Sequence, residues 1–201
     1  SKNDIECNGL NIKDVGIEAK STPLSPDYMQ ATIKYNLDNK RWMGSDKCKI
    51  PKESRDLFMN IINEKELFNN KNPPTNITLE EWHKIKKSDS AWNDHYIYDI
   101  PENTISELYN LKGCSYIQLG RGYGLYHLGN DICNFGVPEF KTKQRIRIRI
   151  KVHESKKLDG NCKLSVTASA QPYDIKNINK SIYSLDDISR LPPNLVYQFN
   201  S

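Results

Sequence analysis

The sequence predicts an α/β protein in which a mixed central sheet is flanked by helices and extended by antiparallel β-hairpins. Two patterns of apolar residues lead to this prediction. At residues 15–20 and again between residues 114 and 168, apolar and polar residues alternate with the two-residue period of strands, and in the middle apolar residues recur at helical spacing. The length of 201 residues suits a single domain over residues 1–201, with room for a small subdomain.

The first clear strand, residues 15–20, has two different faces. Glu18 and Lys20 share one face, because alternate residues of a strand point the same way. The other face is apolar and consists of Val15, Ile17 and Ala19. Packing of that face into a core would hold a carboxylate and an ammonium group together on a rigid support.

A second carboxylate stands near the start of the chain. If Asp4 lies on a neighbouring antiparallel strand, its carboxylate can meet that of Glu18 around one Mg²⁺, a cation that takes oxygen ligands and keeps several waters. Asn8-Gly9 is a two-residue turn signal, and a turn there would pair Asp4 with Lys13 instead, so the register stays open. Asp14 is the substitute acid, but four strand residues place it about 13 Å from Glu18.

Residues 25–35 fit two structures. Ser25-Pro26-Asp27 could start a helix, whereas the following apolar residues alternate as in a strand: Met29, Ala31, Ile33 and Tyr35.

Three helices are expected between residues 53 and 111. The first covers residues 53–68 and presents one apolar stripe suited to covering a sheet. Thr78 and Glu81 form a capping-box signal for a second helix that continues through Ile85. A third helix covers residues 103–111 and is closed by Gly113.

Residues 114–119 and 125–128 form a predicted hairpin, joined by a glycine-rich segment at 120–124. The glycine spacing does not fit a nucleotide-binding loop and no helix start follows, so we expect a flexible turn. Arg121 and Tyr123 at its tip could read or stack on nucleic-acid bases. A mobile loop without a ligand explains the same residues nearly as well.

Residues 144–152 alternate isoleucine or valine with basic residues, which predicts a strand with one buried face and one basic face. The basic residues are Arg145, Arg147, Arg149 and Lys151. At a spacing of about 6.6 Å they could contact phosphates or reach into a groove of DNA. In an edge strand, they would instead block sheet-to-sheet aggregation. Pairing with residues 162–168 through a turn at Asp159-Gly160 would make residues 114–171 a β-hairpin region that could form a DNA-gripping subdomain.

Composition limits the classes of protein that fit. A net charge of +4 and a pI near 8.7 permit a polyanionic partner without requiring one. The five cysteines are scattered, with none of the close pairs of structural zinc sites and no dense disulfide pattern, which favours reduced thiols. No apolar run approaches membrane-spanning length and no signal-peptide pattern begins the chain, so we expect a soluble, cytoplasmic protein without a membrane partner.

Asn3-Asp4 followed by Glu18-Ala19-Lys20 resembles the motif of the PD-(D/E)XK nuclease superfamily, whose fold many type II restriction endonucleases share. The resemblance covers about the first 35 residues. It implies a restriction endonuclease-like fold, with Asp4, Glu18 and the Ala19 carbonyl as Mg²⁺ ligands. Lys20 would orient or activate the attacking water. Physical chemistry agrees with these roles, because a metal lowers the pKa of bound water and a nearby cation stabilises developing negative charge.

The resemblance also raises two questions. The family fold places a helix and a strand before its first acid, whereas only three residues precede Asp4. Either this chain is the distal part of a longer polypeptide, or Asp4 is not the acid. Gln30 follows the motif at a distance where related nucleases often have a polar active-site neighbour.

A second acid–lysine set competes with the first. It consists of Asp131, Glu139 and Lys141. Pro138 weakens this alternative, because proline does not donate a hydrogen bond to a central sheet ladder.

Together these features predict an Mg²⁺-dependent endonuclease that cleaves double-stranded DNA at specific sites, as type II restriction enzymes do. Such enzymes commonly act as dimers, so a homodimer is a further expectation. The alternative is a non-catalytic nucleic-acid-binding domain that uses the basic β-ribbon. A third possibility is a regulatory or structural protein that binds no nucleic acid.

Overall fold

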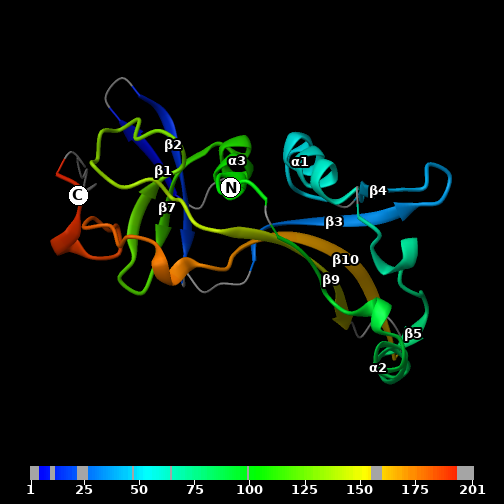
Figure 1. Ribbon diagram of the computed structural model, residues 1–201. Helices are drawn as coiled ribbons and strands as arrows, with labels where there is room; N and C mark the ends of the chain where they lie inside the picture. The colour runs from blue at the N-terminus through cyan, green and yellow to red at the C-terminus, as the bar shows by residue number, and fades with distance from the viewer. Residues whose placement is uncertain are drawn as a thin grey trace. The chain divides into compact units, whose positions relative to one another are not determined.

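The computed structural model describes residues 5–9, 12–21, 27–46, 48–63, 65–98, 100–154 and 160–193, without the side chains of residues 5–9, 12–14 and 154. The chain forms two compact units, and Figure 1 labels most of their helices and strands. The first consists of residues 1–28, 101–144 and 172–201, and the second of residues 29–100 and 145–171. Residues 114–171, grouped in one hairpin region on sequence grounds, thus belong partly to each unit.

The first unit contains a four-stranded sheet with the order β1-β2-β7-β8. Its strands are β1 (Ile5–Gly9), β2 (Ile12–Lys20), β7 (Cys114–Leu119) and β8 (Gly124–His127). The outer strands β1 and β8 run antiparallel to their neighbours, whereas β2 and β7 are parallel to each other. The sheet is therefore mixed, and β2 is an interior strand.

Helix α3 (Thr104–Lys112) brings the chain back to this sheet and leads directly into β7. A parallel strand pair needs a crossover connection rather than a tight turn, and here residues 29–100 of the second unit lie between β2 and α3. The helix ends at Gly113, whose φ of 94° lies in the left-handed region that glycine adopts without a Cβ penalty. This ending fixes where β7 begins.

One face of the sheet in the first unit packs into an apolar core. Ile17 and Tyr116, on the two parallel strands, are fully buried. The complete cluster consists of Val15, Ile17, Tyr116, Leu125, Phe135 and Val137. The apolar face predicted for residues 15–20 thus enters a core at Val15 and Ile17, whereas Ala19 is half-buried.

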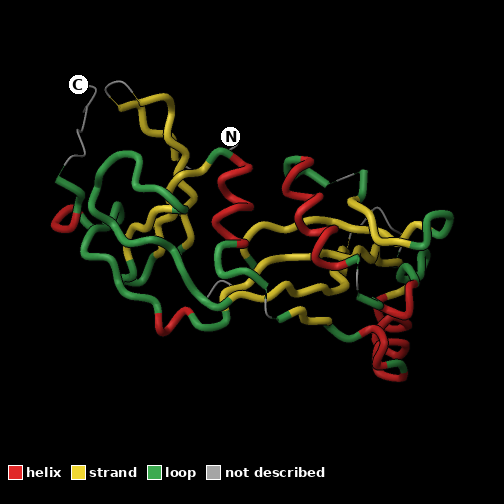
Figure 2. Tube along the Cα trace, turned by 45° about the horizontal axis from the view of Figure 1, so that its top comes forward, coloured by secondary structure: helices red, strands yellow, loops and turns green. Residues whose placement is uncertain are grey.

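The second unit contains a six-stranded sheet in which β4, β3, β10, β9 and β6 are successive neighbours and β5 pairs with β10. The strands are β3 (Tyr28–Asn36), β4 (Arg41–Gly44), β5 (Ile77–Thr78), β6 (His95–Ile97), β9 (Gln144–Glu154) and β10 (Asn161–Pro172). Helix α1 (Lys52–Ile62) contacts β4, and helix α2 (Leu79–Ser88) contacts β5 (Figure 2). Short 3₁₀ turns lie at Phe68–Asn70 and Ser90–Trp92 in this unit, and at Ile175–Asn177 and Ile188–Arg190 in the first unit.

Aromatic rings dominate the core of the second unit. The ring of Phe68 lies 6.0 Å from that of Trp42 and 6.0 Å from that of Trp92. Trp92 in turn meets Trp82 of α2 at 5.9 Å, edge to face. Such geometries are the favourable ones for aromatic pairs. Because these residues come from four separate segments, the ring contacts hold the helices and turns together.

Several predicted elements are confirmed. The chain is a mixed α/β protein with sheets and helices. Thr78 and Glu81 form the capping box that begins α2, with hydrogen bonds in both directions. Helix α3 ends at Gly113 as predicted. The hairpin of residues 114–119 and 125–128 is the antiparallel pair β7 and β8.

Other predictions are wrong or are now decided. Helix α1 ends at Ile62 rather than at residue 68, and Phe68, Asn69 and Asn70 have positive φ values that a right-handed helix excludes. Residues 28–36 form strand β3, not a helix. The turn at Asn8-Gly9 is wrong, because Gly9 still pairs with Ile12 in the β1–β2 ladder.

None of the helices in the described ranges has the length and apolar character needed to cross a membrane.

Candidate functional site

The most distinctive polar cluster of the first unit is centred on Glu18 of β2. Its carboxylate accepts a hydrogen bond from Lys20 Nζ at 2.5 Å, through Oε1. It accepts a second from Lys112 Nζ at 2.6 Å, through Oε2. The side chain of Glu18 is only 6% exposed, and the two lysine side chains are 18% and 25% exposed. Both oxygens of a buried carboxylate are therefore engaged by ammonium groups.

The elements explain how these groups meet. Glu18 and Lys20 alternate along β2 and so share one face. Lys112 is the last residue of α3, where a cation is also favoured by the partial negative charge of the helix end. Gly113 then turns the chain into β7, which pairs in parallel with β2 and aligns Ile117 with Glu18. The parallel pairing brings the end of α3 to the charged face of β2.

Two buried tyrosine rings complete the cluster. The ring of Tyr109 lies 5.4 Å from Lys20 Nζ and 5.7 Å from Lys112 Nζ, and that of Tyr28 lies 5.7 Å from Lys20 Nζ. Ammonium groups at such distances from a ring face are attracted by its quadrupole. Burial raises the pKa of Tyr28 far above its ordinary value, so its hydroxyl stays protonated.

The carboxylate of Glu18 remains ionised in spite of its burial. Desolvation on its own would raise the pKa of Glu18, but hydrogen bonds and charge from Lys112 and Lys20 outweigh it and hold the pKa below its ordinary value. The three groups together carry one net positive charge. Such a cluster can share its carboxylate with a divalent cation, and its ammonium groups can contact a phosphate.

The structure describes the other expected members of this site to different extents. Asp4 lies outside the described residues, and of Asp14 only the backbone, in β2, is described. The β1–β2 ladder pairs Ile5 with Ile17. Ala19 lies in β2 between Glu18 and Lys20 and pairs with Gln118 of β7. Among the residues with described side chains, no group of three or more histidine, cysteine, aspartate or glutamate residues could hold a metal ion.

Gln30 belongs to the second unit, on β3. Its Oε1 accepts a hydrogen bond from Lys151 Nζ at 2.9 Å, so this predicted site residue meets a member of the predicted basic row. The contact joins β3 to β9 across the intervening strand β10. The side chain of Gln30 is half-buried.

The alternative set of Asp131, Glu139 and Lys141 has a different character. Asp131 accepts hydrogen bonds from the Tyr116 hydroxyl at 2.6 Å and from the backbone N–H of Gly136 at 2.7 Å. Burial raises the pKa of Asp131, but these hydrogen bonds outweigh it and hold the pKa below its ordinary value. Glu139 and Lys141 are exposed. The carboxylate of Asp131 is thus used to anchor the loop that follows β8.

The loop between β7 and β8 is held more firmly than a flexible turn. The guanidinium group of Arg190 donates to the Ser181 carbonyl at 2.6 Å and reaches the Gly122 carbonyl at 3.5 Å. Arg121 is exposed at the loop tip with a φ of 57°. Tyr123 is half-buried, and Lys180 Nζ lies 5.4 Å from its ring centre. Of the two predicted base contacts, Arg121 is the more accessible.

The predicted basic strand is β9, which lies between β10 and β6. It pairs with β6 over residues 146–148, so at Arg147 the strand is not a sheet edge, whereas Arg149 and Lys151 lie beyond this pairing. Isoleucines 146, 148 and 150 are buried as predicted. The four basic side chains share the opposite face and are half-buried rather than fully exposed: Arg145, Arg147, Arg149 and Lys151.

Sequence reasoning missed two sets of residues. Lys112 was not linked to Glu18, because a separation of 94 residues gives no local signal. Tyr96 and Tyr98 were also missed, although the tyrosine alternation around Ile97 indicates a strand with an aromatic face. Arg145 lies over the ring of Tyr96, with 4.3 Å between guanidinium carbon and ring centre.

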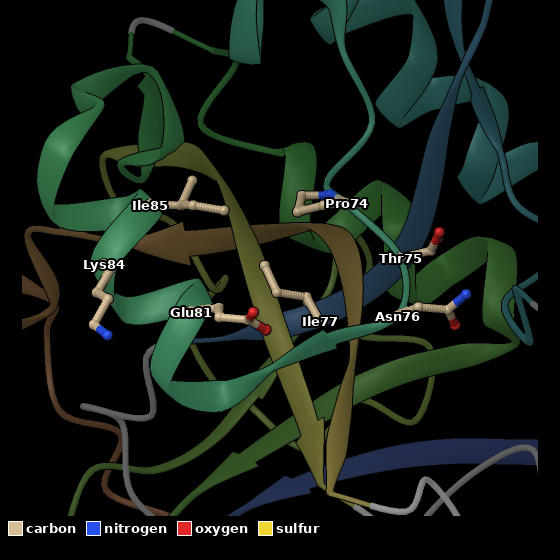
Figure 3. A pocket seen from close by; sticks show the side chains of 7 residues that line it. All are labelled: Pro74, Thr75, Asn76, Ile77, Glu81, Lys84 and Ile85. Carbon is tan, nitrogen blue, oxygen red and sulfur yellow. The ribbon is translucent and has the colours of Figure 1, made fainter.

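The second unit also contains two hollows. One, of about 370 Å³, lies between α2 and the segment that includes β5 (Figure 3). The acidic residue that lines it, Glu81, takes part in the capping box, and the basic residue that lines it, Lys84, forms an ion pair with Glu80. The other, of about 520 Å³, includes His153, which shares a hydrogen bond of 2.8 Å with Ser165. Neither hollow brings together residues predicted to act in catalysis.

Comparisons of this chain with protein-family models, with curated proteins and with solved structures found no match.

Proposed function

We propose that this protein is an Mg²⁺-dependent DNA endonuclease of the PD-(D/E)XK kind, with site-specific cleavage of double-stranded DNA as its activity. The observation that carries the proposal is the buried Glu18 carboxylate on an interior strand, paired with the partly buried Lys20 and with Lys112 from the helix before the parallel strand. Buried charges cost free energy, and sites of catalysis are where proteins retain them. Two copies acting together would allow both DNA strands to be cut.

The chain's own residues fit a metal site in part. Glu18 is ionised, as a metal ligand must be, although a cation would have to displace one of its two ammonium partners. The proposal retains Asp4 as the second acid. The pairing of Ile5 with Ile17 supports this choice, because Asp4 precedes Ile5 and Glu18 follows Ile17. The Ala19 carbonyl would be the third protein ligand.

Each group then has a definite role. When bound, Mg²⁺ lowers the pKa of a coordinated water and neutralises charge on the phosphodiester. Lys20, beside Glu18, would orient the attacking water or stabilise the negative charge that develops on phosphorus-bound oxygens. Lys112, on the other carboxylate oxygen, would contact the same phosphate group. The rings of Tyr109 and Tyr28 exclude water from beneath both ammonium groups.

The test is cleavage of mixed plasmid DNA with Mg²⁺ and with EDTA. We expect discrete fragments only with Mg²⁺, and loss of at least about a hundredfold in rate for Glu18→Gln and for Lys20→Met, in line with the cost of removing one electrostatic contact in a transition state. The matched control uses the exposed pair of the same spacing, as Glu139→Gln and Lys141→Met. Cleavage that survives both changes in β2 would overturn the assignment, and its loss in the variants at 139 and 141 would move the site to the alternative set.

A non-catalytic nucleic-acid-binding domain is the second candidate. It is favoured by two basic side chains whose hydrogen-bond partners are uncharged. Arg145 donates to Gln171 and to the Tyr98 hydroxyl, and Lys151 donates to Gln30. A cation whose contacts are neutral keeps its full attraction for phosphate. In this case Arg147→Ala would weaken DNA binding and reduce its salt dependence, and no product would form with Mg²⁺.

A further inference from the structure

An aromatic pair lies on the surface of the second unit, on and just after β6. The rings of Tyr96 and Tyr98 stack with 6.2 Å between centres and 29° between planes. They remain 40% and 48% exposed. The two tyrosines form an exposed aromatic pair, called the platform below, because Ile97 between them is buried and directs both rings to the same face.

A guanidinium group completes this platform. Arg145 lies 4.3 Å from the ring centre of Tyr96 and 5.6 Å from that of Tyr98. Its Nη1 donates to the Tyr98 hydroxyl and its Nε to Gln171 Oε1, each at 3.0 Å. These contacts hold the planar cation against the rings, so the three side chains are fixed in place before any ligand arrives.

The platform continues into the basic face of β9. The β6–β9 ladder places Tyr96 opposite Arg147, and residues that face each other in an antiparallel pair point to the same side of the sheet. Lys151 lies on the same face, four residues further along β9, and its contact is the neutral Gln30. Aromatic rings at one end of a positively charged face are the combination that binds single-stranded nucleic acid.

We propose that Tyr96, Tyr98 and Arg145 form a stacking site for an unpaired nucleobase, with the basic face of β9 holding the adjoining phosphates. The inference rests on the proposed action on nucleic acid and adds that the bound strand is unpaired where it crosses this platform. A base presents a π face to the tyrosine rings, which a base pair inside a duplex does not. Sequence preference at this point would be weak, because every base has such a face.

The experiment measures binding by fluorescence anisotropy in EDTA, so that no cleavage occurs. The probes are a labelled oligothymidine of about 12 nucleotides, a size within the usual range for one binding site, and an abasic oligomer with the same number of phosphates. We expect the wild-type protein to bind oligothymidine more tightly. Tyr96→Leu and Tyr98→Leu should each weaken oligothymidine binding at least about fivefold and leave the abasic oligomer almost unaffected, because stacking contributes roughly 1–3 kcal/mol per base.

The matched control is Tyr173→Leu, because Tyr173 is 43% exposed and lies in the first unit. This variant should bind both probes as the wild type does. Equal losses on both probes, or no preference of the wild type for bases over abasic sites, would overturn the stacking site. Glu18→Gln separates the two proposals. Loss of its cleavage with the preference for oligothymidine over the abasic oligomer retained supports the nuclease independently of the stacking site. Tyrosine-dependent binding by a wild type that cleaves nothing keeps the stacking site and removes the nuclease.

Discussion

Glu18 is a charge that the protein keeps at a cost. Removal of a carboxylate and two ammonium groups from water costs several kcal/mol per ion, and apolar residues of similar volume often give equal or greater stability. The partners Lys20 and Lys112 remain partly exposed, which reduces that cost without abolishing it. Stability alone therefore does not explain the cluster, whereas the proposed catalytic use of its charges would.

The same residue makes stability depend on pH. The pKa of Glu18 is lowered in the folded state, so the unfolded chain binds more protons there. Stability therefore rises with pH between the folded-state pKa and the ordinary pKa. The contribution is complete above the ordinary value of 4.5 and is lost as the pH falls through the folded-state pKa. Melting temperatures of Glu18→Gln should therefore fall less steeply with acid than those of the wild type. Parallel curves would mean that the ion pairs of Glu18 do not stabilise the fold.

Asp131 gives a contrasting prediction. Its carboxylate accepts two backbone N–H groups and a tyrosine hydroxyl, and an asparagine amide would turn one acceptor into a donor that faces another donor. We expect Asp131→Asn to lower the free energy of unfolding by about 1 kcal/mol, because the carboxylate is half-buried and the N–H of Gly136 is exposed to water. Cleavage per folded molecule should stay unchanged at a temperature where the variant is folded. A variant of normal stability without cleavage would instead make Asp131 the catalytic acid.

At the level of elements, the site depends on where α3 ends. Gly113 terminates the helix directly after Lys112 and one residue before β7. A helix that continued through residue 113 would send the chain into β7 in a different direction, because each helical residue turns the backbone by about 100°. The left-handed conformation of Gly113 therefore positions the ammonium group that reaches Glu18.

Two glycines with nearly equal φ values separate backbone strain from steric overlap. At Gly113, with a φ of 94°, an added Cβ would have no other atom within 4 Å, whereas at Gly124, with a φ of 95°, it would lie 2.3 Å from the Tyr183 carbonyl oxygen. Gly113→Ala should cost about 1–2 kcal/mol from the left-handed backbone alone. Gly124→Ala should cost clearly more, as measured by urea denaturation. Equal losses would show that the loop at Gly124 moves away from the new methyl group at little cost.

The elements that local signals specify could be predicted from the sequence. The capping box of Thr78 and Glu81 and the glycine at the end of α3 depend on neighbouring residues only. The sequence predicts a helix α1 that is too long, because Leu67 and Phe68 continue its apolar spacing. Both side chains are buried, but they lie at the start of a separate 3₁₀ turn. Tertiary packing, not local pattern, decides such a boundary.

The candidate site likewise combines residues that a local pattern predicts with residues that only the tertiary fold brings together. The shared face of Glu18 and Lys20 follows from strand alternation, so the sequence predicts it. Lys112 joins them only through a parallel strand pair closed over a long connection, which no local pattern specifies. The tyrosine platform likewise requires the antiparallel pairing of β6 with β9.

At the scale of the whole molecule, the two units are interleaved in sequence. Residues 101–144 of the first unit connect the two segments of the second unit, and residues 29–100 and 145–171 of the second unit interrupt the first. All three tryptophans, at 42, 82 and 92, belong to the second unit. Tryptophan emission therefore reports on the second unit, whereas far-UV circular dichroism reports on both.

This arrangement predicts that damage to the first unit also weakens the second. If the first unit unfolds, residues 101–144 become a flexible loop whose closure costs about 3 kcal/mol, a large share of the stability of a typical domain. Ile17→Ala, at a fully buried position of the first unit, should thus lower the urea midpoint of tryptophan emission as well as that of circular dichroism. Leu37→Ala, at a position 73% exposed, should shift neither midpoint. If Ile17→Ala moves only the dichroism, the two units fold independently, and loop closure does not couple them.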